Sequence, residues 1–125
     1  MTALNENALT KVSSVPDVDM KTVGKTVLYS VPPGKTFIPV LVVVRNPSGS
    51  LAGGTDYGFG TGVNADTWRQ GVDLSTMAAG DYMAIGGQDV TKYAKCPAGS
   101  EFGIKVNTGA TDPATVIIDI YGYLA

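Results

Sequence analysis

Few residues in this chain of 125 could carry out covalent or metal chemistry. The sequence contains no histidine, and Cys96 is its single cysteine. These counts exclude Ser-His-Asp and Cys-His nucleophilic sites, and zinc sites built from histidine and cysteine. Because no histidine is present to activate the thiol beside Pro97, we expect Cys96 to be a small, buried, apolar side chain.

Paired carboxylates are the remaining catalytic option, and Asp17 and Asp19 form the one close pair among 11 acidic residues. General acid–base catalysis needs two carboxylates facing one bond, whereas this pair suits the solvated entry to a strand. With Asp112 the pair would offer oxygen ligands to calcium, but no loop spacing organises them. We therefore predict no catalytic residue, no metal, no cofactor and no enzymatic activity.

The stretch GGTDYGFGTG, residues 53–62, is glycine-rich but lacks the Gly-Lys-Ser/Thr ending of a phosphate-binding loop. Strand alternation places Tyr57 and Phe59 on one face and glycines on the other. A strand without side chains on one face allows another segment to approach closely. We expect close packing here.

An aromatic platform for a sugar is a second chemical option. Tyr57 and Trp68 could stack on a pyranose ring, flanked by the amides and acids of Asn64, Asp66 and Gln70. The alternative is that Trp68, the lone tryptophan, packs one end of a β core. Both interpretations require a scaffold of strands.

Composition limits the partners of this chain. Only 16% of residues are charged, against about 25% in an average soluble domain, while 44% are hydrophobic. The net charge of −2 and the scattered lysines and arginines argue against binding to nucleic acid or an anionic membrane. No apolar run approaches the ~20 residues of a membrane span, and MTALNENALT lacks the order of a signal peptide. We expect synthesis in the cytoplasm.

Alternation of apolar and polar residues recurs along the chain and predicts an all-β fold of about eight strands. The expected strands lie at 18–23, 25–31, 36–45, 55–61, 68–74, 81–86, 100–107 and 115–124. Short strands separated by turn residues indicate a sandwich or barrel. Pro32 to Phe37 and Pro97 to Phe102 share the pattern Pro-x-Gly-x-x-Phe, which places both phenylalanines near one end of the core.

Residues 1–17 are polar and lack strand periodicity, so we expect an extended N-terminal arm followed by one domain, residues 18–125. A frayed terminus is the alternative. As an arm on a neighbouring subunit, the segment would make contact through Leu4, Leu9 and Val12.

The run VLVVV, residues 40–44, is apolar on both faces of its strand, so a loop or another subunit must cover the second face. The last strand sends Val116, Ile118 and Ile120 to one face and a half-aromatic set to the other. These observations predict a subunit interface formed by Val40, Val42, Val44, Tyr121 and Tyr123.

The order of these features resembles the small jelly-roll cement, or decoration, proteins on the capsids of tailed bacteriophages. The resemblance rests on TVLYSVPPGKTFIP, residues 26–39, on the polar arm, the valine run and the glycine-laden strands, and covers residues 25–125. It implies a jelly-roll sandwich, a homotrimer at three-fold points of the shell, the major capsid protein as partner, and a location on the virion capsid surface. The alternative function is a carbohydrate-binding sandwich, or a fibre or tail component that binds a receptor.

Overall fold

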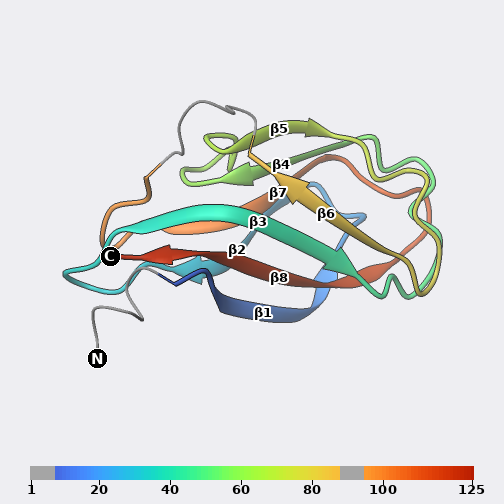
Figure 1. Cartoon of the computed structure of the whole chain (residues 1–125). Helices are drawn as coiled ribbons and strands as arrows, with labels where there is room; N and C mark the ends of the chain where they lie inside the picture. The colour runs from blue at the N-terminus through green and yellow to red at the C-terminus, as the bar shows by residue number, and fades with distance from the viewer. Residues whose placement is uncertain (1–7, 88–94) are drawn as a thin grey trace.

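The computed structural model describes residues 8–87 and 95–125, and their regular structure is entirely β (Figure 1). Eight strands follow one another along the chain. They are β1 Thr10–Asp19, β2 Gly24–Ser30, β3 Phe37–Arg45, β4 Asp56–Gly60, β5 Arg69–Val72, β6 Tyr82–Gly86, β7 Glu101–Thr108 and β8 Thr115–Leu124. The described part of the chain contains no helix of the length and apolarity needed to cross a membrane.

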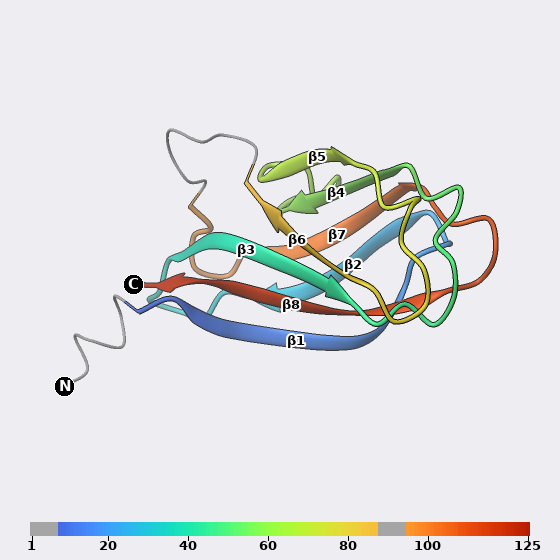
Figure 2. The same ribbon diagram turned by 45° about the vertical axis from the view of Figure 1, so that its right-hand side comes forward.

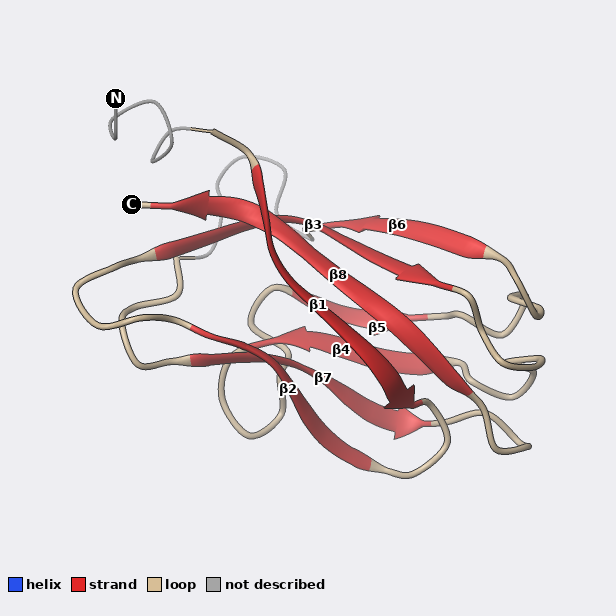
Figure 3. Cartoon of the chain, turned by 90° about the horizontal axis from the view of Figure 1, so that it is seen from below, coloured by secondary structure: helices blue, strands red, loops and turns tan. Residues whose placement is uncertain are grey.

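The strands form two four-stranded sheets that pack face to face (Figures 2 and 3). Sheet A has the order β1-β8-β3-β6 and sheet B the order β2-β7-β4-β5, with every neighbouring pair antiparallel. Successive strands from β1 to β4 alternate between the sheets, which is the connectivity of an eight-stranded jelly roll. The expected all-β, jelly-roll sandwich is confirmed.

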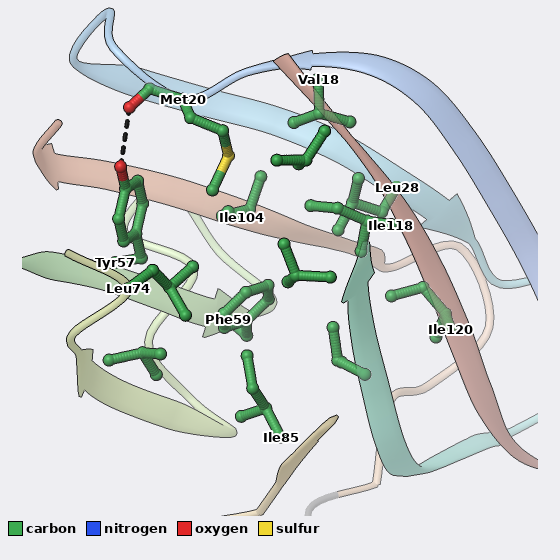
Figure 4. Close-up of a cluster of buried hydrophobic side chains, with 14 of the residues drawn as sticks. Val18, Met20, Leu28, Tyr57, Phe59, Leu74, Ile85, Ile104, Ile118 and Ile120 are labelled. Carbon is green, nitrogen blue, oxygen red and sulfur yellow. Dashed lines mark hydrogen bonds between the residues drawn. The ribbon is translucent and has the colours of Figure 1, made fainter. Parts of the chain in front are cut away.

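The core lies between the two sheets and is filled by the inward side of each alternating strand (Figure 4). In β8 the inward residues Val116, Ile118 and Ile120 are at most 1% exposed. The two repeated turns bring Phe37 and Phe102 together, with ring centroids 6.1 Å apart and the rings edge to face. Gly34 and Gly99 take the positive φ that each turn requires, at 74° and 81°.

Strand β1 begins earlier than the alternation predicts, because Thr10–Asp19 pairs with β8 along the edge of sheet A. Residues 10–17 of the expected arm therefore belong to the sandwich. Two register shifts, between Lys11 and Ser13 and between Val15 and Val18, interrupt the regular ladder. Residues 1–7 of the expected arm, Leu4 among them, lie outside the described residues.

Candidate functional site

The outer face of sheet A is the first feature with functional potential, because it is apolar in its two central strands. From β3 it carries Ile38, Val40, Leu41, Val43 and Arg45, and from β8 it carries Ile117, Asp119, Tyr121 and Tyr123. The register places Leu41 opposite Tyr121 and Ile38 opposite Tyr123. No third layer of secondary structure from the described ranges covers this face. We refer to these nine residues as the dry face.

The valine run divides between the core and the dry face. Val42 and Val44, two of the five expected interface residues, are 0% exposed inside the sandwich, so they cannot contact another subunit. Val40, Leu41 and Val43 are half-buried and do not belong to the core cluster. A register shift between Pro39 and Leu41 fixes this division, since it changes which residues of β3 point inward.

An ion pair lies toward one end of the dry face, where β3 ends at Arg45. Arg45 Nε donates to Asp119 Oδ2 at 2.8 Å, and Ser14 Oγ donates to Asp119 Oδ1 at 2.6 Å. Asp119 is only 4% exposed. Burial alone would raise the pKa of this carboxyl, but the hydrogen bonds from Arg45 and Ser14 outweigh burial and hold the pKa below its ordinary value. The carboxylate is therefore charged and compensated, and this end of the face is locally neutral.

The outer face of sheet B has the opposite character. Lys25 lies opposite Lys105, and Gly58 and Gly60 of β4 lie opposite Lys105 and Gly103. The sandwich thus has one apolar outer face and one polar, glycine-rich outer face.

A polar hollow of about 470 Å³ opens on the sheet B side. Gly58 and Gly71 contribute backbone, and the polar side chains that line it are those of Asp56, Asn64, Asp66, Gln70 and Asn107. We call these seven residues the polar hollow. Two carboxylates and three carboxamides can accept and donate hydrogen bonds, but provide no nucleophile.

The segment after β4 folds back over this strand because the glycines leave room. A Cβ on Gly58 would lie 2.9 Å from the carbonyl oxygen of Ala65, and one on Gly60 would lie 2.5 Å from the backbone nitrogen of Thr67. The close packing expected for the glycine-rich stretch is confirmed.

Neither ring of the expected glycan platform is available to stack on a sugar. Tyr57 is 0% exposed, and its hydroxyl donates to the carbonyl oxygen of Met20 at 2.8 Å (Figure 4). Trp68 is 4% exposed, its Nε1 donates to the carbonyl oxygen of Pro39, and its ring packs edge to face against Phe102. The prediction of an aromatic platform is therefore wrong, because both rings belong to the core. The flanking residues Asn64, Asp66 and Gln70 instead line the polar hollow.

The remaining candidate residues have separate positions. Leu9 is 50% exposed just before β1, whereas Val12 is half-buried and packs against the core. Cys96 is buried, as expected, and desolvation raises the pKa of its thiol to about 11, so the reactive thiolate is scarce at neutral pH. Asp19 accepts hydrogen bonds from the backbone N–H groups of Lys21 and Thr22, which is a structural use of this carboxylate.

Comparison with known proteins gives a structural likeness only. No protein-family model matches the chain, and no curated protein sequence matches it. Two solved structures do. One is the cyanophage Pam1 capsid asymmetric unit, with a TM-score of 0.54 and 15% identity over 89% of this chain and 80% of the matched chain. The other is the acidic stable capsid structure of Helicobacter pylori bacteriophage KHP30, with a TM-score of 0.53 and 13% identity over 92% of this chain and 91% of the matched chain. What the three chains share is the fold.

Proposed function

We propose that this chain is a non-enzymatic structural protein of a bacteriophage virion, a capsid cement or decoration protein that bridges neighbouring major capsid subunits. The observation that carries the proposal is the dry face, on a fold shared with chains from two phage capsid structures. A protein of this kind acts by burying surface against its neighbours. An apolar face whose one pair of charges is already compensated suits that action.

We assign the dry face to contacts between copies of this chain in a homotrimer. Strands of nine and ten residues, in a sheet of four, give a face of roughly 30 Å by 19 Å. This four-stranded face, of which the dry face is the central part, covers about 570 Å². Each partner buries ~800 Å² in a standard interface, so the proposed interface extends beyond the dry face. Since Arg45 and Asp119 neutralise each other, copies can meet without repulsion between like charges. The proposed interface residues are therefore Val40, Leu41, Val43, Tyr121 and Tyr123, with Leu41 and Val43 in place of the buried Val42 and Val44.

Substitution of Leu41 by lysine tests the assembly. Leu41→Lys places a charge opposite Tyr121 in the dry face, and Val23→Lys is a matched control because Val23 is 65% exposed outside the strands. We expect light scattering to give a trimer for the natural protein and the control, and a monomer for Leu41→Lys at the same concentration. Circular dichroism confirms that each variant is folded, and Tyr123→Lys repeats the test near the end of the sheet. A monomeric natural protein would refute self-association through this face.

Co-sedimentation tests the partner. Mixed with phage capsids from which accessory proteins have been removed, the natural protein should bind to saturation at a fixed ratio to the major capsid protein. We expect deletion of residues 1–9 to lower occupancy, because Leu9 remains exposed on the isolated sandwich and is available to a neighbouring subunit. A trimer that never sediments with capsids would refute the cement role and leave the assembly intact.

The alternative function, a carbohydrate-binding module or a receptor-binding fibre or tail component, loses its aromatic platform because Tyr57 and Trp68 are buried. One observation still favours sugar chemistry, and it lies in the polar hollow.

A further inference from the structure

The polar hollow has unused hydrogen-bonding capacity. The side chains of Asp56, Asn64, Asp66 and Asn107 make no hydrogen bond or ion pair with another residue in the described ranges. On the same outer face, by contrast, the side chain of Lys25 is engaged, since its Nζ donates to the carbonyl oxygens of Gly62 and Glu101. The four side chains of the hollow are therefore free to bind a polar ligand.

The hollow is held by backbone that the fold constrains tightly. Gly58 lines it, and a Cβ on this residue would lie 2.9 Å from the carbonyl oxygen of Ala65. Ala65 itself is fully buried and has a φ of 43°, a conformation uncommon for a residue with a side chain. Asn64 and Asp66 flank this residue, so the packing of the loop onto β4 fixes the backbone positions of both. The backbone that carries these two side chains is therefore already in place before a ligand binds.

The residue types select the class of ligand. Two carboxylates disfavour an anion, and a lining of acids and amides offers nothing to an apolar molecule. The carboxamide oxygens and the two carboxylates could face a cation, but the described residues contain no group of three or more acidic, histidine or cysteine side chains that could hold a metal ion. A cation would also leave the N–H donors of the three carboxamides unused. A neutral molecule with several hydroxyl groups can use both the donors and the carboxylate acceptors. The volume of about 470 Å³ lies within the ~300–1,000 Å³ of small-molecule sites.

We propose that the polar hollow binds a neutral saccharide through Asp56, Asn64, Asp66, Gln70 and Asn107, without an aromatic stacking ring. The site lies on the outer face of sheet B, and the dry face lies on the outer face of sheet A, so the two surfaces point in opposite directions (Figure 3). Saccharide binding is therefore compatible with a covered dry face and independent of the proposed cement role.

Nuclear magnetic resonance tests the site directly. The ¹⁵N-labelled full chain is titrated with methyl glycosides of neutral hexoses and N-acetylhexosamines. We expect at least one sugar to shift the side-chain NH₂ signals of Asn64, Gln70 and Asn107 together. Asp66→Ala and Asn107→Ala should each lower the affinity for that sugar about tenfold or more, because each removes a hydrogen bond from the complex. Asp112→Ala is the matched control, since Asp112 is exposed in a loop outside the hollow.

Three results would overturn the proposal. The first is a panel in which no sugar shifts these signals. The second is a sugar whose affinity is the same in Asp66→Ala, Asn107→Ala and the natural protein. The third is a response to calcium chloride alone, which would make the hollow a cation site. Wild-type thermal unfolding in both site variants ensures that lost binding reflects the site and not the fold.

Discussion

At the scale of single residues, Asp119 explains how the dry face can contain a charge. Its two carboxylate oxygens accept hydrogen bonds from Ser14 on β1 and from Arg45 on β3, so β8 is joined to both of its neighbours at one point. Hydrogen bonds to a charged group contribute about 1.5–3 kcal/mol to stability. The pair therefore stabilises the sheet in the single chain, before any neighbour binds.

The lowered pKa of Asp119 predicts a pH dependence of stability. Because the folded pKa lies below the ordinary value of 3.8, the contribution of Asp119 is complete above that value and is lost as the pH falls through the folded pKa. Asp119→Asn should be about 1.5–3 kcal/mol less stable than the natural protein at pH 7, with a smaller difference below pH ~4. Urea unfolding at a series of pH values measures both. Asp112→Asn should follow the natural protein, and a constant difference at all pH values would contradict the assignment.

Single-residue roles were predictable wherever the alternation was clean. In β8 the outward set Ile117, Asp119, Tyr121 and Tyr123 follows directly from the sequence, and the structure confirms it. The valine run of β3 could not be divided in this way, since five consecutive apolar residues carry no information about their faces. For Tyr57 the alternation gave the shared face with Phe59 but not whether this face was the core, and the structure places both rings inside.

At the scale of elements, β1 illustrates the limit of strand periodicity. Its apolar residues Val12, Val15 and Val18 are spaced by three, which is not a strand pattern. The two register shifts each change the phase of the strand, so that all three valines reach the core. A sequence pattern of period two cannot anticipate where such irregularities occur, whereas it located the other seven strands to within a few residues.

The close packing of the 61–67 loop on β4 gives a prediction for this element. Gly58→Ala should destabilise the fold by about 1–3 kcal/mol, because its Cβ would lie 2.9 Å from the backbone oxygen of Ala65, too close without a shift of the loop. Gly49→Ala is the control, since no atom lies within 4 Å of its added Cβ. Chemical denaturation compares the two. Equal stability of both variants would show that the loop is not held against the strand.

At the scale of the whole molecule, strand order depends on contacts between distant parts of the chain. Strand β1 pairs with β8, and β2 pairs with β7, so the two ends of the sequence close the sandwich together. Local patterns predicted the strands and a sandwich or barrel, but they carry no information about which strands pair. The jelly-roll order was implied by family resemblance alone, and the pairing of the sheets confirms it.

Truncation of the N-terminus tests whether residues 10–17 are a dispensable arm or an integral strand of the sandwich. Deletion of residues 1–9 leaves the whole of β1, so we expect the unfolding temperature to stay close to that of the full chain. Deletion of residues 1–17 removes eight of the ten residues of β1, including Val12 and Val15, which pack against the core. It also exposes the backbone edge of β8 along most of its length, which favours aggregation. We expect this variant to be clearly destabilised or to precipitate, since two partly buried valines and most of the β1–β8 hydrogen bonds are lost together. Thermal unfolding followed by circular dichroism measures both variants, and a soluble 18–125 fragment of full stability would show that β1 is an appendage of the sandwich.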